Sequence, residues 1–183
     1  MSKKRVLVVI DCQNDFITGS LKNEDAIKAI PNVVKKIREF DGDAIFYTLD
    51  THGDNYLKTN EGKKLPVVHC VYGTEGWKLN PDVETAINEQ REKMHVQNIE
   101  KPTFGSFVLA DAINGIVSYG DELEIEIIGF CTDICVVSNA LILKATFFDR
   151  ASIRIIEDCC AGVTPETHSA ACKTMEMCQI EVI

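Results

Sequence analysis

The stretch GFCTDICVVSNA, residues 129–140, places two cysteines four residues apart, where a strand-like run gives way to a helix-like pattern. Thr132 or Asp133 is expected to cap the helix, which would put Cys135 in its first turn. The positive end of a helix lowers the pKa of a nearby thiol, and the thiolate is the nucleophilic form. Cys131 would lie in the preceding turn and act through its backbone. The alternative is that Cys135 is a buried, unreactive cysteine of an apolar helix.

Asp11 and Lys101 are the charged residues that could activate such a thiol. Asp11 stands in DCQNDF directly after the apolar run 5–10, and Lys101 stands in KPTFGSF after the run 94–99. Partial burial raises the pKa of a carboxylate toward that of a useful base, and a lysine charge beside a thiol favours the thiolate. Taken alone, Asp11 could instead cap a turn, and Lys101 could be a solvated surface residue.

Asp50, His52, Glu61 and His69 offer ligands for a divalent ion. Alternate residues of an extended segment share a face, so the side chains of Asp50 and His52 in DTH point to one side. Two carboxylates and two imidazoles suit Zn²⁺, Mn²⁺ or Fe²⁺. The alternative is that these loop histidines are ordinary surface residues.

The other histidines and most of the cysteines are expected to be structural. His95 lies within a predicted strand, and His168 lies within a predicted helix. The eight cysteines form no pair of C-x-x-C motifs, which argues against a zinc ribbon, and nothing else suggests a secreted, disulfide-linked protein. Most thiols, including the adjacent Cys159 and Cys160, are expected to be small buried hydrophobes.

Apolar, strand-like runs alternate along the chain with segments of helical periodicity. Such alternation predicts a mostly parallel six-stranded sheet with helices on both faces, a three-layer α/β fold. Ligands bind such sheets at the carboxyl ends of the strands, where the residues above are expected to meet. The predicted strands are 5–10, 43–50, 94–99, 123–130, 152–158 and 179–183, and the predicted helices are 25–40, 81–90, 106–120, 132–150 and 164–178.

Length and charge narrow the class of protein. The 183 residues suit one domain over residues 1–183, and the formal net charge of −9 without a basic patch argues against a nucleic-acid partner. No apolar run approaches the roughly 18 residues that span a bilayer. The apolar run Val6 to Ile10 is too short for the core of a signal peptide, so a cytoplasmic protein without a membrane partner is expected.

Together, DCQNDF, DTH with the later HC, KPTFGSF and GFCTDICV resemble the isochorismatase-like cysteine hydrolases, particularly the nicotinamidases among them, in matching order over nearly the whole chain. The resemblance implies a Rossmann-like six-stranded sheet and a catalytic triad of Asp11, Lys101 and Cys135. It also implies a cis peptide between Phe130 and Cys131, which would aim the Cys131 and Cys135 amides at one point as an oxyanion hole.

The resemblance further implies a cofactor and a reaction. A metal, zinc in the first instance and manganese or iron otherwise, would contact the pyridine nitrogen of the substrate and be held by Asp50, His52 and His69. Glu61 is the expected fourth ligand, with Asp54 as a substitute. Phe16 would pack against the substrate ring, although KLPVV before His69 lacks the aromatic residue that nicotinamidases often carry.

The reaction expected from this resemblance is hydrolysis of a small amide, nicotinamide in the first place, to acid and ammonia through a thioester. One alternative is a metal-free relative acting on carbamoyl or ureido amides, in which the loop histidines are incidental. Another is a thiol-bearing redox sensor, which would need Cys135 without Asp11 and Lys101. Vinyl-ether hydrolysis is disfavoured, since true isochorismatases lack the cysteine. Family habit also implies a homo-oligomer.

Overall fold

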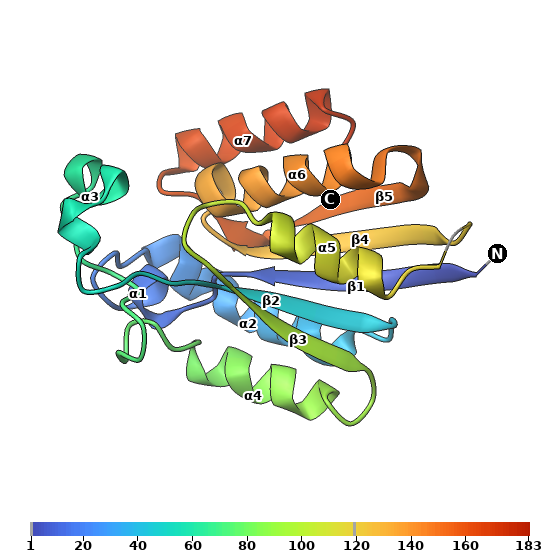
Figure 1. The fold of residues 1–183 in the computed structure, drawn as a ribbon, viewed down its shortest axis with the longest axis horizontal. Coiled ribbons are helices and arrows are strands. Elements are labelled where there is room, and N and C mark those ends of the chain that lie inside the picture. Colours follow the sequence, from blue (N-terminus) through green and yellow to red (C-terminus); the bar gives the residue numbers. More distant parts are fainter. Residues whose placement is uncertain (1, 119) are drawn as a thin grey trace.

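A parallel six-stranded sheet forms the centre of the molecule (Figure 1). The computed structural model describes residues 2–118 and 120–183. Neighbouring strands follow the order β3-β2-β1-β4-β5-β6 and all pair in parallel, so the predicted Rossmann-like sheet is confirmed. The strands are β1 Lys3–Ile10, β2 Ala44–Asp50, β3 His95–Lys101, β4 Glu122–Phe130, β5 Ala151–Ala161 and β6 Glu181–Val182.

Helices cover both faces of the sheet and bury one core on each side (Figure 1). Val6 and Val8 of β1 pack in the core formed with α5, α6 and α7, whereas Leu7 and Val9 pack in the core formed with α2 and α4. This division explains the uninterrupted apolar run of β1, because both of its faces are buried. The helices are α1 Asn14–Ile17, α2 Glu24–Glu39, α3 Asn60–Lys64, α4 Pro81–Gln90, α5 Phe107–Gly115, α6 Val137–Phe147 and α7 Pro165–Met177, with 3-10 helices at Tyr56–Lys58 and Phe148–Arg150.

The carboxyl ends of β1, β2, β3 and β4 lie at the same edge of the sheet. Asp50 of β2 pairs with Lys101 of β3, and Ile10 of β1 pairs with Gly129 of β4. Gly129 has φ 120°, and a Cβ at this position would lie 2.0 Å from the carbonyl oxygen of Ile10. Only glycine permits this close approach, which brings the residues after β1 beside those after β4.

Several helices and strands have different boundaries in the structure from those predicted. The helix expected over 132–150 is divided into a π-helical turn Thr132–Val136, α6 and a 3-10 helix. The helix expected over 106–120 ends at Gly115, since glycine is a weak helix former, and Tyr119 lies outside the described residues. β5 extends beyond 158 to Ala161 because a shift of register lets it pair with the end of β4, and β6 is confined to Glu181–Val182.

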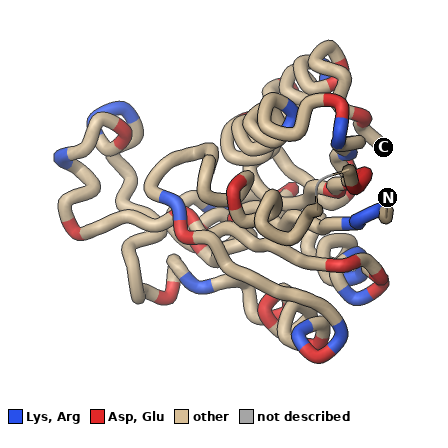
Figure 2. Tube along the Cα trace, turned by 45° about the vertical axis from the view of Figure 1, so that its right-hand side comes forward, with Lys and Arg blue, Asp and Glu red and all other residues tan. Residues whose placement is uncertain are grey.

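Lys and Arg positions are interspersed among Asp and Glu positions along the chain trace (Figure 2). Within residues 2–118 and 120–183, no helix has the length and apolar character needed to cross a membrane.

Candidate active site

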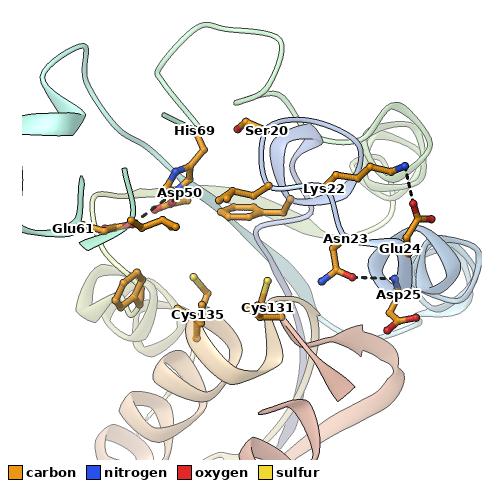
Figure 3. Close-up of a pocket in the computed structure, with 16 residues that line it drawn as sticks. Ser20, Lys22, Asn23, Glu24, Asp25, Asp50, Glu61, His69, Cys131 and Cys135 are labelled. Atoms are coloured by element: carbon orange, nitrogen blue, oxygen red, sulfur yellow. Dashed lines mark hydrogen bonds and ion pairs between the residues drawn. The ribbon is translucent and has the colours of Figure 1, made fainter. Parts of the chain in front are cut away.

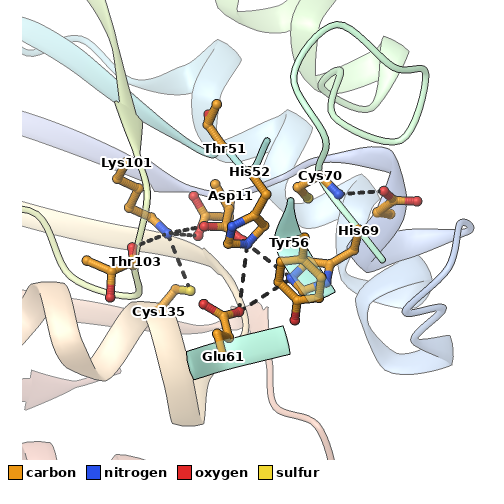
Figure 4. Close-up of polar contacts among 12 residues, drawn as sticks. Asp11, Thr51, His52, Tyr56, Glu61, His69, Cys70, Lys101, Thr103 and Cys135 are labelled. Carbon is orange, nitrogen blue, oxygen red and sulfur yellow. Dashed lines mark hydrogen bonds and ion pairs between the residues drawn. The ribbon is translucent and has the colours of Figure 1, made fainter. Parts of the chain in front are cut away.

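Lys101 joins Asp11 and Cys135 into one buried group at the carboxyl edge of the sheet (Figure 4). The Lys101 Nζ atom lies 2.6 Å from Asp11 Oδ2 and 3.5 Å from Cys135 Sγ. It also donates to the carbonyl oxygen of Thr103 at 3.1 Å. Thr48 holds the Asp11 carboxylate from the other side, with its hydroxyl donating to Oδ1 at 2.6 Å. The predicted triad residues therefore meet, although they come from three different strand ends.

Burial and charge set the proton affinities of this group. Burial raises the pKa of the Asp11 carboxyl above its ordinary value, while the charge of Lys101 opposes the rise. Burial also raises the pKa of the Cys135 thiol, with Asp11 adding to the rise and Lys101 opposing it. Burial alone would lower the pKa of Lys101, but the adjacent Asp11 and Cys135 raise it overall, so the lysine stays charged.

The turn that carries Cys135 differs from the predicted helix start. Cys131 occupies the N-cap position without a side-chain capping bond, so the predicted capping by Thr132 or Asp133 is wrong. The Thr132 hydroxyl instead contacts His168, and the Asp133 carboxylate accepts from the Val163 amide. The predicted lowering of the Cys135 pKa is also wrong here, because desolvation by burial raises this pKa. Lys101 is the group that favours the thiolate.

The peptide between Phe130 and Cys131 is cis, as the resemblance implied. The Cys131 carbonyl accepts from the Ile134 and Val136 amides, which gives the turn its π-helical character. Among the described residues, the Cys131 amide itself has no hydrogen-bond acceptor. It is therefore available to a ligand in the cavity beside Cys135.

Asn139 is a site residue that the sequence analysis missed. Its fully buried side chain donates to the carbonyl oxygens of Cys135, at 2.7 Å, and Phe104, at 3.0 Å. It also accepts from the Ser106 amide at 3.0 Å. These bonds fix the turn that carries Cys135 to the loop after Lys101. The available signal was an amide side chain in a largely apolar helix, because a polar group buried in such a helix needs hydrogen-bond partners.

Asp50, His52, Glu61 and His69 converge beside the triad, with one ligand atom from each lying within 4.8 Å of the others. Figure 4 shows His52, Glu61 and His69 next to one another. The two imidazole Nε2 atoms lie 3.0 and 3.6 Å from Asp50 Oδ2, and both lie 3.7 Å from Glu61 Oε1. Asp54, the substitute considered for Glu61, is exposed and lies outside this group.

The donor atoms of this group fit a divalent ion. His69 Nδ1 donates to the Val67 carbonyl oxygen at 2.8 Å, so its Nε2 atom presents a lone pair to the group. Within the part of the chain that the structure describes, the buried Asp50 Oδ1 has no hydrogen-bond partner, and Lys101 Nζ lies 3.6 Å away. The Tyr56 ring packs on His52 and His69, with centroid distances of 4.7 and 4.8 Å, and fixes their orientation. A buried group of two imidazoles and two carboxylates is the ligand set of a divalent metal.

A cavity of about 790 Å³ opens between the triad and the metal-ligand group. The sulfur atoms of Cys131 and Cys135 point into it from one side, with His69, Asp50 and Glu61 opposite (Figure 3). Cys135 is thus reached through the cavity, although only 4% of the residue is exposed. The cavity is lined further by Phe16, Ser20, Leu21, Lys22, Asn23, Glu24, Asp25, Leu65, Phe104, Ile134 and Val163.

The chain matches a known family over nearly its whole length. The model of the isochorismatase domain family matches residues 5–183. A nicotinamidase/pyrazinamidase of Mycobacterium tuberculosis is 25% identical over 192 aligned positions, with 98% of each chain covered.

Solved structures agree with this match. The crystal structure of a nicotinamidase/pyrazinamidase from Bacillus subtilis has a TM-score of 0.81 at 24% identity and covers 98% of both chains. The crystal structure of a pyrazinamidase of Pyrococcus horikoshii in complex with zinc has a TM-score of 0.75 at 26% identity, again covering 98% of both chains.

Proposed function

The chain belongs to the isochorismatase domain family, and we propose that it is an amidase that hydrolyses nicotinamide to nicotinate and ammonia. One observation carries the proposal: Lys101 lies within contact distance of both Asp11 and Cys135, and Cys135 lines a cavity that the metal-ligand residues Asp50, Glu61 and His69 also line. A redox-sensing thiol would need no such partners. The relatives named above supply the substrate class, a small aromatic amide.

In the first half of the proposed reaction, Asp11 accepts the proton of the Cys135 thiol while Lys101 stabilises the thiolate. The sulfur forms a bond to the amide carbon, and the carbonyl electron pair moves to the oxygen. That oxyanion accepts from the Cys131 and Cys135 amides. The carbon–nitrogen bond then breaks, the nitrogen takes the proton from Asp11, and ammonia leaves a thioester on Cys135.

In the second half, Asp11 accepts a proton from a water molecule whose oxygen attacks the thioester carbon. The carbon–sulfur bond breaks, the Cys135 sulfur regains a proton from Asp11, and the carboxylic acid leaves. The raised pKa of Asp11 suits this repeated exchange, because it makes the carboxylate a stronger base than an exposed aspartate.

We propose that Asp50, His52, Glu61 and His69 bind a divalent ion, and that the ion is zinc, as in the Pyrococcus horikoshii relative. When bound, such an ion supplies a Lewis acid for a nitrogen or oxygen atom of the substrate. The Phe16 ring lines the same cavity and packs on His69, with a centroid distance of 5.7 Å, so it is placed to contact the substrate ring. A metal-free relative would have no use for this ligand group.

The decisive experiment measures ammonia and nicotinate released from nicotinamide by the purified protein, with Cys135→Ala as the inactive comparison. Equal release of both products by the wild type, and none above background by the variant, is expected. If the protein released ammonia from carbamoyl or ureido amides but not from nicotinamide, nicotinamide would not be its substrate. Activity that survives in Cys135→Ala would rule out the thioester mechanism.

The assembly of the protein is a separate proposal. We propose that residues 1–183 form one domain, since a chain of this length suits a single domain. We also propose that the protein is a homo-oligomer, on the family resemblance alone. Light scattering coupled to size exclusion gives the mass that tests this, and a mass near 20.4 kDa would show a monomer.

A further inference from the structure

A second group of metal-binding side chains lies away from the active-site cavity. Glu157 comes from β5, and His168 and Cys172 lie four residues apart on α7, so they share one helix face. His168 Nε2 lies 3.4 Å from Glu157 Oε1 and 3.7 Å from Cys172 Sγ. One ligand atom from each residue lies within 4.8 Å of the others. The sequence analysis treated His168 as structural because it lies within a predicted helix, and the sequence alone did not show that Glu157 and Cys172 lie beside it.

The three ligand atoms of this group differ chemically, and their combination favours some metal ions over others. A carboxylate oxygen, an imidazole nitrogen and a thiolate sulfur suit borderline ions such as Zn²⁺ or Co²⁺, and they do not suit Mg²⁺ or Ca²⁺. Three protein ligands leave the fourth tetrahedral position to a water molecule. Cys172 is buried, whereas 54% of the Glu157 side chain is exposed, so an ion can enter from the solvent side.

The second ring nitrogen of His168 also lies within hydrogen-bonding distance of a neighbouring side chain. His168 Nδ1 lies 2.8 Å from the Thr132 hydroxyl oxygen, and Thr132 is fully buried at the start of the π-helical turn. Histidines that bind metals commonly make such a bond with the nitrogen that does not contact the ion, which fixes the orientation of the ring. The bond therefore leaves His168 Nε2 directed at Glu157 and Cys172.

We propose that Glu157, His168 and Cys172 form a second divalent-metal site, specific for zinc-like ions, behind the turn that carries Cys135. Binding replaces the Cys172 thiol proton, which passes to solvent, by a metal–sulfur bond. It also selects the His168 form with the proton on Nδ1, which donates to Thr132. The bound ion links β5, α7 and the π-helical turn, and this proposal does not depend on the amidase function.

Cobalt absorption distinguishes this site from the first ligand group, which contains no cysteine. We expect Co²⁺ added to the chelator-treated protein to give a thiolate-to-cobalt charge-transfer band in the near ultraviolet. The band should persist in Cys135→Ala and in Cys178→Ala, which removes an exposed thiol at the end of the same helix. It should disappear in Cys172→Ala and in His168→Ala, and Cys172→Ala should bind one equivalent of zinc less than the wild type.

Absence of the band from the wild type, or its survival in Cys172→Ala, would overturn the proposal. Circular dichroism of the metal-free variants checks that α7 still folds. If Cys172→Ala does not fold, Glu157→Gln provides the test. The Glu157 side chain is half exposed, so its replacement should leave the fold intact. We expect Glu157→Gln to weaken cobalt binding by about tenfold or more, and an unchanged affinity would contradict the site.

Discussion

The Lys101 ammonium lies 2.6 Å from the Asp11 carboxylate, and both side chains are almost completely buried. Removing one partner of such a pair leaves an uncompensated charge in the interior, which costs about 3–5 kcal/mol. Replacing both removes the two charges of this pair together. Single and double variants of this pair can therefore separate its contribution to stability from its contribution to catalysis.

We predict that Lys101→Met and Asp11→Asn each lower kcat/KM by a factor of about 100 or more, because each removes the activation of Cys135. Lys101→Met should also lower the free energy of unfolding by about 3 kcal/mol, and the double variant should recover much of that loss without recovering activity. Urea unfolding and ammonia release measure the two effects. A double variant with restored activity would show that the pair is only structural.

The fourth metal ligand can be tested with a matched pair of variants. Glu61→Gln removes a carboxylate that lies 3.7 Å from both imidazoles, whereas Asp54→Asn changes an exposed residue outside the group. We predict that Glu61→Gln loses metal about tenfold or more readily than the wild type, and that Asp54→Asn retains it. Metal analysis after dialysis against a graded chelator gives the comparison. The reverse result would move the ligand to Asp54.

Asn139 should be required for both stability and turnover. Asn139→Ala leaves the buried carbonyl oxygen of Cys135 and the partly buried one of Phe104 without this donor, so we predict a loss of about 2–3 kcal/mol in the free energy of unfolding. Because the turn that carries Cys135 loses its attachment, kcat should fall more than KM rises. Ser138→Ala, one residue earlier and half-buried, is the control. Equal effects of the two variants would contradict the assigned role.

Phe16 should act on substrate binding. Its ring lines the cavity beside His69, so Phe16→Ala removes a packing surface for the substrate without touching the triad. We predict a KM for nicotinamide raised by about tenfold, with a smaller change in kcat. Phe107→Ala, in which a 75% exposed ring is removed, should leave both constants unchanged. A fall confined to kcat would place Phe16 in the chemistry.

Glu124 makes the stability of the fold depend on pH. Lys3 holds the pKa of the Glu124 carboxyl below its usual value, with Arg154 adding to the effect. The ion pairs therefore stabilise the folded state above the ordinary pKa of glutamate, and this contribution is lost as the pH falls through the lowered pKa. We predict that Glu124→Gln lowers the free energy of unfolding by about 1 kcal/mol at neutral pH and by less near pH 3, because protonation of the carboxyl weakens the ion pairs. Glu122→Gln, on the same strand but exposed, is the control for urea unfolding at both pH values.

The sequence predicts the fold well where local pattern and tertiary packing agree. The apolar run of β1 and the helical stripe of α2 are read directly from residue order, because each buries the faces that its periodicity implies. The meeting of Asp11, Lys101 and Cys135 follows from a general rule for parallel sheets. The raised pKa of Cys135 does not follow, since desolvation depends on the complete structure.

Other parts of the site could not be found in the sequence. The bonds of Asn139 to Phe104 and Ser106 cannot be read from the sequence, because these partners come from the loop after β3. The sequence also did not show that Cys131, and not Thr132 or Asp133, occupies the N-cap position of the Cys135 turn. The approach of Glu157 to His168 depends in the same way on the packing of α7 against β5. Residue spacing identifies the side chains that lie on one face of a single helix or strand. The tertiary structure determines which side chains from different elements come into contact.

The central pair of strands, β1 and β4, supplies the aspartate and the cysteine, but the lysine arrives only with β3 at the edge of the sheet. A refolding intermediate that lacks this outer strand would have a largely formed core and no turnover. The recovery of enzymatic activity during refolding therefore reports the docking of β3. It should lag behind any spectroscopic signal that reports the pairing of β1 with β4.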